Sequence, residues 1–324
     1  MPGSDLQPIL WGLTAVWVVS LLATVYYTNK VRTIFLGTDV SGTPVPLPES
    51  LPPAEGEVVT FLADDRVELA GVFLLARGAE PGEARPVVIF SHAVGTGGGA
   101  YERHVDWLRA DGYHIFAFDH RGHGRSQGLS GHQPRQWVTR YEIADLKGAI
   151  AHVRERPEFA PGKIVLFGLS RGAGTSVATA HLAPDVCAVV ADSLFTNWHT
   201  LLERSRKWAR IVLRSDWLGR NVPFFVFYYL GASTMLLSEI CDRVPYSSVE
   251  RGLDRWKGRP LAIVHGERDA YISVAQSRML AQRFELAPES YLEVARARHN
   301  DAIIAQPELY QEFVTGFLSR SLGA

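Results

Sequence analysis

Cysteine is scarce in this chain, and neither sign of charge predominates. Two cysteines, Cys187 and Cys241, are too few to indicate the disulfide framework of a small secreted domain. The chain has 33 lysines and arginines against 34 aspartates and glutamates, so charge gives no reason to expect a nucleic-acid partner. We also see no internal repeat. These absences favour a globular protein whose partner is not a nucleic acid.

Charge is also missing from residues 9–27, and we expect residues 1–36 to be a membrane anchor. As a helix, 9–27 would extend about 28 Å, close to the about 30 Å thickness of a hydrocarbon core. Trp11 and Tyr26 lie at its two ends, where they suit the membrane interfaces. The alternative, a cleaved signal peptide, would need a basic start and a small-residue cleavage site, and we find neither.

The charges around this span predict its orientation. Lys30 and Arg32 follow it, whereas only Asp5 precedes it, so the positive-inside tendency predicts a single-pass protein with its remaining residues in the cytoplasm. Residues 37–56 are rich in proline and small polar residues, which is typical of a semi-extended tether. The remainder, 57–324, has a sensible length for one further domain.

Ser170 lies in a Gly-x-Ser-x-Gly motif between an apolar run at 164–167 and a helical pattern at 171–182. This order predicts a sharp strand-to-helix turn that exposes the serine hydroxyl, and a side chain at Gly168 or Gly172 would crowd that turn. The helix N-terminus would favour a developing oxyanion. The alternative is an ordinary turn in which the serine is incidental.

A nucleophilic serine needs a base and an oriented acid, and candidates for both follow it in the chain. Asp269 lies in a turn after the apolar run 262–265, and His299 lies in a loop after the run 291–294. All three side chains are therefore expected at carboxyl ends of strands, where sites assemble in open parallel sheets.

Two residues compete for these roles. Asp192, at the end of another apolar run, is an alternative acid, although beside Ser193 it could instead cap the next segment. His265 is an alternative base, although its place at a strand end suggests a local hydrogen bond. We favour Asp269 and His299.

Strand and helix patterns alternate along the chain. Strands are expected near 58–62, 67–75, 87–91, 115–119, 164–168, 188–192, 262–265 and 291–294, and helices at 101–110, 139–154, 171–182, 274–284 and 307–319. This alternation predicts an α/β fold with a mostly parallel eight-stranded sheet covered on both faces. Continuously apolar interior strands agree, because both of their faces would be buried.

Beyond the tether, the chain resembles the α/β-hydrolase family. The resemblance rests on Ser170 in its turn, on His-Gly-x-x-Asp at 265–269, and on His299 followed by Asn300. It implies the α/β-hydrolase fold, with Ser170 as nucleophile, Asp269 as acid and His299 as base. It is strongest to membrane-anchored serine hydrolases that act on acyl esters, thioesters and lysophospholipids.

The resemblance also implies an oxyanion hole. In this family a His-Gly-x segment follows an early strand, and the N–H of x joins the N–H of the residue after the nucleophile, here Arg171. Val94 occupies position x, but Ala93 replaces the usual glycine, so the second donor is left open between Ala93 and Val94. Three glycines at 97–99 indicate a mobile loop that can approach other groups closely.

A further family match, 119–126, contains His120 and His123 close to Asp119. A zinc site would need further convergent ligands, which the sequence does not supply, so we expect no metal. The resemblance instead implies a structural turn in which Asp119 and Arg121 brace loops around the site.

An insertion at about 194–258 corresponds to the family's cap over the active site. It is basic and helical at 201–210 and strongly apolar at 223–230. The apolar run would line a pocket for an acyl chain, or it would simply pack the cap onto the core. The residues expected in the pocket are His92, Leu169, Phe224, Phe225, Phe227 and Tyr228.

Taken together, these features predict a membrane-anchored serine hydrolase that needs no cofactor. We expect it to cleave carboxylic esters or thioesters of an apolar small molecule or lipid through an acyl-enzyme on Ser170. A serine here argues against the dehalogenases and epoxide hydrolases of this fold, which use aspartate. The alternatives are a peptidase or amidase with the same residues, and a membrane-anchored scaffold without catalysis.

Overall fold

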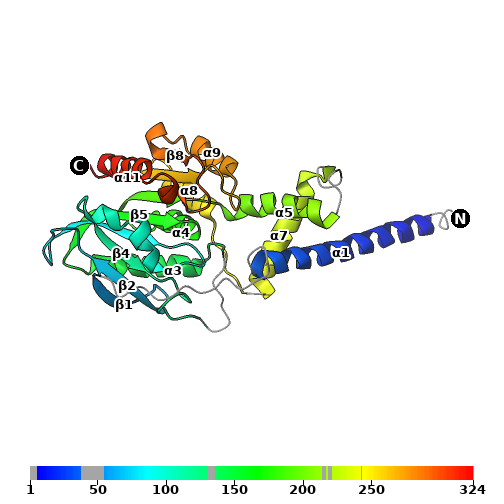
Figure 1. Ribbon diagram of the computed structural model, residues 1–324. Coiled ribbons are helices and arrows are strands. Elements are labelled where there is room, and N and C mark those ends of the chain that lie inside the picture. Colours follow the sequence, from blue (N-terminus) through cyan, green and yellow to red (C-terminus); the bar gives the residue numbers. More distant parts are fainter. Residues whose placement is uncertain are drawn as a thin grey trace. The chain divides into compact units, whose positions relative to one another are not determined.

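The computed structural model describes residues 6–37, 55–129, 136–213, 217, 221–241 and 243–323 (Figure 1). The chain divides into two compact units. The helical unit comprises Met1–Pro44 and Thr200–Val244, and the sheet unit comprises Val45–His199 and Pro245–Ala324. The helical unit thus combines the predicted anchor with most of the predicted cap, two segments that the sequence pattern treats as separate.

The sheet unit contains all eight predicted strands. They are β1 (Glu57–Leu62), β2 (Glu68–Leu74), β3 (Arg85–Ser91), β4 (His114–Phe118), β5 (Phe159–Leu169), β6 (Val186–Asp192), β7 (Leu261–Gly266) and β8 (Tyr291–Val294). Their order across the sheet is β1-β2-β4-β3-β5-β6-β7-β8. β2 pairs antiparallel with β1 and β4, and every other neighbouring pair is parallel. The predicted mostly parallel sheet is confirmed.

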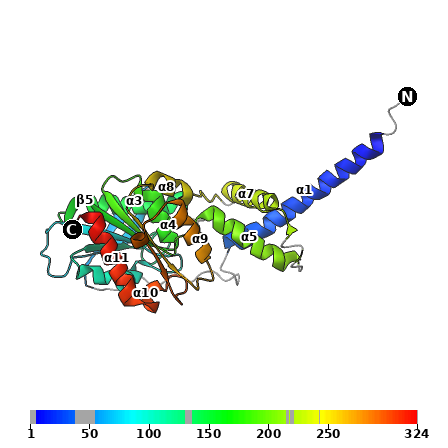
Figure 2. The ribbon, with the colours of Figure 1, turned by 90° about the horizontal axis from the view of Figure 1, so that it is seen from above.

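Helices cover both faces of this sheet (Figure 2). The helices α3 (Arg140–Arg154), α4 (Arg171–Ala180), α8 (Val249–Trp256) and α9 (Val274–Arg283) contribute to one core cluster, and α2 (Tyr101–His104), α10 (Ala302–Ala305) and α11 (Pro307–Leu322) contribute to the other. Successive β5 residues alternate between them: Ile164 and Leu166 face the first cluster, Val165 and Phe167 the second. Burial on both faces explains the continuously apolar strand.

The helix expected at 101–110 is interrupted. Val105 leaves the helical conformation, with φ −139° and ψ −10°, and a 3₁₀ turn follows at Asp106–Arg109. The turn directs Arg109 so that its Nε donates a hydrogen bond to the carbonyl oxygen of Leu75 at 2.7 Å. A tertiary contact therefore overrides the local helical pattern.

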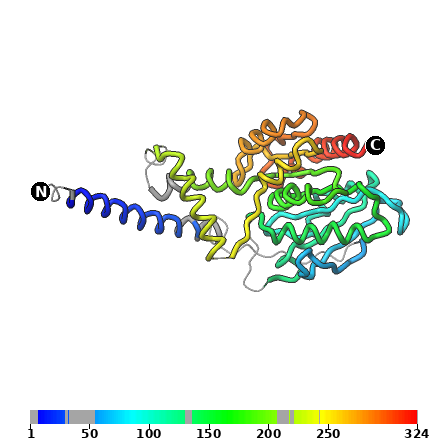
Figure 3. Tube along the Cα trace, turned by 180° about the vertical axis from the view of Figure 1, so that it is seen from behind, coloured from blue at the N-terminus to red at the C-terminus, as the bar shows by residue number. Residues whose placement is uncertain are grey.

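The helical unit contains α1 (Leu6–Gly37), most of α5 (Asn197–Leu213) and α7 (Phe224–Cys241). Among the described residues, two segments are long and apolar enough to cross a membrane: Gln7–Asn29 in α1, where the sequence predicts a span, and Phe224–Cys241, where it predicts none. α1 and α7 contact one another (Figure 3). The predicted tether lies almost wholly outside the described residues.

Candidate active site

Ser170 occupies the turn between β5 and α4 in a strained backbone conformation, with φ 51° and ψ −110°. Positive φ is uncommon for a residue with a side chain and marks strain that the surroundings must hold. Here the Ser170 N–H donates to the carbonyl oxygen of Asp192 at 2.8 Å, and the Gly174 N–H donates to the Ser170 carbonyl oxygen at 3.1 Å. The end of β6 and the first turn of α4 thus fix the serine.

The two glycines of the motif lie where no side chain fits. A Cβ on Gly168 would come within 2.3 Å of the Gly172 carbonyl oxygen. A Cβ on Gly172 would come within 2.0 Å of the Ser91 carbonyl oxygen, at the end of β3. Because these obstacles are backbone atoms, neither can move aside without shifting a strand or a helix. The close approach expected from the sequence is therefore present.

Ser170, His299 and Asp269 lie in one hydrogen-bonded chain. Ser170 Oγ is 2.8 Å from His299 Nε2, and His299 Nδ1 is 2.5 Å from Asp269 Oδ2. A carboxylate can only accept, so Nδ1 carries the proton, and Nε2 of the neutral ring accepts from the serine hydroxyl. This is the arrangement in which a histidine can take a serine proton.

The environment of Asp269 favours its ionised form. Burial alone would raise its pKa, but the hydrogen bonds from His299 and from the N–H of Ile272 together lower the pKa below its ordinary value. Its Oδ1 accepts from the N–H groups of Tyr271 and Ile272, at 2.8 and 2.9 Å. The turn after β7 therefore fixes the carboxylate while its other oxygen orients His299.

The two competing residues make other contacts, although His265 Nε2 also lies 3.4 Å from Asp269 Oδ2. Asp192 Oδ2 accepts from the Tyr310 hydroxyl at 3.0 Å, and its Oδ1 accepts from Ser193 Oγ at 2.9 Å. Burial raises the pKa of Asp192 to about 6. His265 Nε2 lies 3.1 Å from the Ile272 carbonyl oxygen, in keeping with the local hydrogen bond expected for it. The structure thus brings Asp269, and not Asp192, to His299.

Sequence reasoning missed how Asp192 supports the site. Ser193 Oγ, which donates to Asp192, also accepts the backbone N–H of Asn300 at 3.1 Å. Residue 192 thus connects to the nucleophile through its carbonyl oxygen and to the residue after His299 through Ser193. Tyr310, from α11, completes this network and resembles an ordinary core residue in the sequence. Only its spatial position reveals the role.

The loop after β3 has a fixed peptide orientation. The Ala93 carbonyl oxygen lies 2.7 Å from His92 Nδ1 and accepts from Thr96 Oγ1 at 2.9 Å and from the Thr96 N–H at 3.3 Å. In a planar trans peptide the N–H points opposite to the carbonyl, so the Val94 N–H is directed away from these donors. Of the two candidate oxyanion donors, Ala93 and Val94, the N–H of Val94 is therefore the one whose direction these hydrogen bonds fix.

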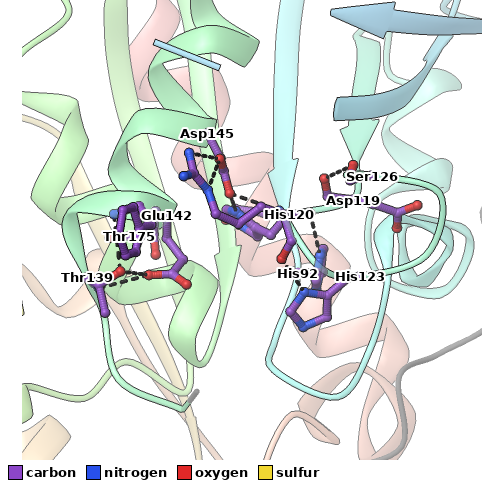
Figure 4. A network of polar contacts seen from close by, with 12 residues as sticks. His92, Asp119, His120, His123, Ser126, Thr139, Glu142, Asp145 and Thr175 are labelled. Atoms are coloured by element: carbon purple, nitrogen blue, oxygen red, sulfur yellow. Dashed lines mark hydrogen bonds and ion pairs between the residues drawn. The ribbon is translucent and has the colours of Figure 1, made fainter. Parts of the chain in front are cut away.

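Three buried histidines, His92, His120 and His123, lie close together at the start of this loop (Figure 4). His92 is fully buried, its Nε2 accepts from the His120 N–H at 3.0 Å, and its ring lies 4.8 Å from that of His123. Burial and the two neighbouring rings lower the pKa of His92 well below its usual range. Burial and the charge of Arg171 lower the pKa of His123 to about 3. We interpret the rings as a neutral support for the loop.

The 119–126 turn braces the same region. Asp119 Oδ1 accepts from the Gly98 N–H at 2.7 Å, and the Arg121 guanidinium bonds the carboxylates of Asp145 and Asp65. The glycine-rich segment is not a free loop, because Gly98 is buried and begins a 3₁₀ turn. Within the part of the chain that the structure describes, no group of three His, Cys, Asp or Glu residues could hold a metal ion.

The residues expected in a substrate pocket fall into two groups. His92 and Leu169 are buried in the sheet unit. Phe224, Phe225 and Tyr228 are exposed on α7 of the helical unit, whereas Phe227 is buried there. The pocket itself stays a prediction.

Comparison with known proteins supports the fold. The Hydrolase_4 family model, described as serine aminopeptidase S33, matches residues 82–224. An esterase of Pyrococcus furiosus, Pf2001, superposes with a TM-score of 0.58 at 20% identity, covering 85% of this chain and 97% of its own. Est1E of Butyrivibrio proteoclasticus, with bound ferulic acid, gives 0.58 at 16% identity, covering 82% and 100%. The protein has the α/β-hydrolase fold.

Two relatives found by sequence match the chain to different extents. The protein YfhR of Salmonella typhi is 27% identical over 286 residues, which are 84% of each chain. The quorum-quenching protein AidA of Acinetobacter baumannii is 32% identical over 116 residues, which are 35% of this chain and 37% of its own. With the family match, these similarities support a hydrolase.

Proposed function

We propose that the protein is a serine hydrolase that cleaves carboxylic esters or thioesters through an acyl-enzyme on Ser170. The observation that carries the proposal is the 2.8 Å contact between Ser170 Oγ and His299 Nε2, with Asp269 on the opposite ring nitrogen. The esterases among the superposed structures support the same reaction class.

The reaction has two steps. Ser170 Oγ attacks the acyl carbon while its proton passes to His299 Nε2, and Asp269 stabilises the imidazolium. The bond to the leaving oxygen or sulfur breaks, and the leaving group takes this proton. Water then attacks the acyl-enzyme, His299 accepts a proton from it and returns one to Ser170, and the carboxylic acid departs. No cofactor takes part in these steps.

We assign the oxyanion donors to the backbone N–H groups of Arg171 and Val94. Arg171 begins α4, so its N–H lies at the positive end of the helix dipole. The fixed Ala93 carbonyl supports Val94 rather than Ala93 as the second donor. A preformed orientation would avoid reorganisation as the charge develops.

The description of the matching family gives a second candidate, an aminopeptidase. Such an enzyme needs an acceptor for the substrate's ammonium group. Two carboxylates linked to Ser170 already accept hydrogen bonds: Asp269 from His299, and Asp192 from Tyr310. This use of the local carboxylates favours an uncharged ester over a peptide N-terminus.

A fluorophosphonate probe tests the nucleophile. We expect the full chain in detergent to be labelled, Ser170→Ala to remain unlabelled, and Ser176→Ala, on the same helix, to be labelled like the parent. Failure of the folded parent to react would overturn the proposal. A panel of p-nitrophenyl esters against aminoacyl p-nitroanilides then separates the candidates, since faster turnover of the anilides would favour the peptidase.

We further propose that α1 anchors the protein in a membrane with the sheet unit on the cytoplasmic side. The apolar segment Gln7–Asn29 supports the span, and Lys30 and Arg32 directly after it support the orientation. Proteolysis of right-side-out and inverted vesicles tests the orientation, because only inverted vesicles should lose the sheet unit.

A further inference from the structure

α7 exposes an apolar surface, which is unfavourable in contact with water. Its only charged residue is Glu239, near the end of the helix. Large apolar side chains are exposed along its length: Phe224, Phe225, Tyr228, Tyr229, Leu236 and Ile240. A surface helix in water turns such residues inward, and a continuous exposed patch marks an interaction site.

The inward side of α7 carries one large residue, Phe227, near its start and is otherwise small and hydroxylic. Gly231, Thr234 and Ser238 are buried, and the Thr234 and Ser238 hydroxyls each donate to the carbonyl oxygen four residues earlier, at 2.7 Å. Small residues at helix contacts and hydroxyls bonded to their own helix are typical of helices packed in lipid.

α1, which contacts α7, likewise shields polar side chains and exposes apolar ones. Of the α1 residues whose side chains the structure describes, Thr24, Thr28 and Arg32 are the shielded ones, and they lie on one face near the C-terminal end. The apolar residues around them are exposed. α7 therefore packs against a helix that is long enough to cross a membrane and that also exposes its apolar residues.

The segment that contains α7 leaves and rejoins the sheet unit at one place. Asn197 Nδ2 donates to the carbonyl oxygens of Val138 and Ser247, at 3.2 and 3.0 Å. Thr139 pairs with Tyr246 as an isolated antiparallel bridge. Because both ends are held at the same point, the segment between them must cross a membrane an even number of times or not at all.

A second crossing has no suitable helix among the described residues. α5, which precedes α7, carries charges throughout its central turns: Glu203, Arg204, Arg206, Lys207 and Arg210. Charges of this density do not cross a hydrocarbon core. The Arg206 guanidinium lies over the rings of Phe224 and Phe227, at 5.2 and 5.8 Å, as a basic side chain does at a membrane interface.

We propose that α7 is embedded in the leaflet next to the sheet unit, beside the last turns of α1, with lipid acyl chains as the partner of its exposed apolar side. This proposal rests on the membrane anchoring proposed for α1. It replaces the pocket-lining role expected for Phe224, Phe225 and Tyr228. The protein then has two membrane attachments, of which only α1 crosses the bilayer.

Spin-label accessibility tests the proposal on the full chain. Cys187→Ala and Cys241→Ala remove the native thiols, and single labels are placed through Phe225→Cys, Leu236→Cys or Ile240→Cys. Val19→Cys on α1 is the lipid control, and Leu182→Cys, exposed on the sheet unit, is the water control. The protein is reconstituted in phosphatidylcholine and phosphatidylglycerol vesicles, and collisions with oxygen and with a water-soluble nickel chelate are measured.

We expect nickel collisions at 225, 236 and 240 to fall about fivefold or more below those at 182, with oxygen collisions matching those at 19. Values at the three positions that match 182 would overturn the proposal. Low collisions with both reagents, accompanied by dipolar broadening, would overturn it in favour of a second copy of this chain. If position 19 also behaves as 182 does, the anchor itself fails. Fluorophosphonate labelling of Ser170 in each variant reports separately on the proposed hydrolase.

Discussion

The sheet unit and the helical unit distribute their side chains in opposite ways. In the sheet unit, β5 buries Ile164 to Phe167 completely. In the helical unit, Val19 is 65% exposed while Thr28 and Ser238 are buried. The first arrangement is stabilised by removing apolar surface from water, and the second suits a surrounding that is itself apolar. The proposed membrane attachment would account for this difference between the two units.

The units also differ in their buried polar groups. In the sheet unit these groups converge from distant parts of the chain, as when Asp192 binds Tyr310 and, through Ser193, Asn300. In the helical unit the hydroxyls of Thr234 and Ser238 bond only to their own helix. Convergent polar groups can perform chemistry, whereas locally satisfied ones permit packing. Substitutions in the two units should therefore affect different measurements.

The largest expected effect is a difference in kcat between substitutions of two carboxylates of the sheet unit. Asp269→Asn should lower kcat by about 10⁴-fold, because the amide no longer holds the His299 tautomer that accepts the serine proton. Asp192 does not bond His299, and asparagine keeps the shape of its side chain. Asp192→Asn should therefore lower kcat by about tenfold at most. Steady-state kinetics with a soluble ester measure both, and vesicle flotation should be unchanged. Equal losses would count against Asp269 as the acid.

A second pair compares glycines of the two units. Gly172→Ala should lower the free energy of unfolding by about 4 kcal/mol, because the new Cβ lies 2.0 Å from the backbone oxygen of Ser91. Gly12→Ala in α1 meets no atom within 4 Å and should be neutral or slightly favourable to the helix. Urea unfolding in detergent, followed by fluorescence, gives the difference. A tolerated Gly172→Ala would show that β3 can move away from α4.

The sequence could predict the features that depend on local patterns and could not predict those that depend on contacts between distant segments. Strand patterns and the order of Ser170, Asp269 and His299 depend on local periodicity and motif spacing, and these predicted the sheet and the grouping of the three side chains. The break at Val105 and the role of Tyr310 depend on contacts between distant segments, which no local pattern contains. The apolar run at 223–230 was visible, but the buried face of the helix that it begins, with Phe227, Gly231, Thr234 and Ser238, emerges only when the helix has a neighbour.

A third pair places the same charge on exposed valines of the two units. Val19→Asp should disfavour insertion of α1 by about 3 kcal/mol, because a carboxylate near the middle of the span is poorly solvated. Val58→Asp in β1 is 46% exposed in the parent and should change partition little. Extraction of membranes with alkaline carbonate measures partition. If both variants remain equally in the membrane fraction, the contrast between the two surfaces is wrong for α1.

The last expected effect, no larger than that of Val19→Asp, is a dependence of stability on pH that acts on the sheet unit through Asp192. Burial raises its pKa from 3.8 to about 6, so between these values the folded protein holds a proton that the unfolded chain has released. Wild-type stability therefore falls as pH rises through this window, by up to about 3 kcal/mol from this group. Asp192→Asn lacks the titration, so its stability relative to wild type should rise by that amount between pH 4 and pH 7.

Urea unfolding of wild type and of Asp192→Asn at pH 4 and pH 7 measures the difference between their free energies of unfolding. The contributions of other titrating groups cancel in this difference. Tyr310→Phe removes a donor to the same carboxylate and should extend the pH-dependent range upward. A constant difference between wild type and Asp192→Asn would mean that the carboxyl is ionised throughout. Asp192 would then be a buried charge beside the site, within the network that runs from Ser193 to Asn300. It would act on the electrostatics at His299 rather than on the shape of the loop that contains His299.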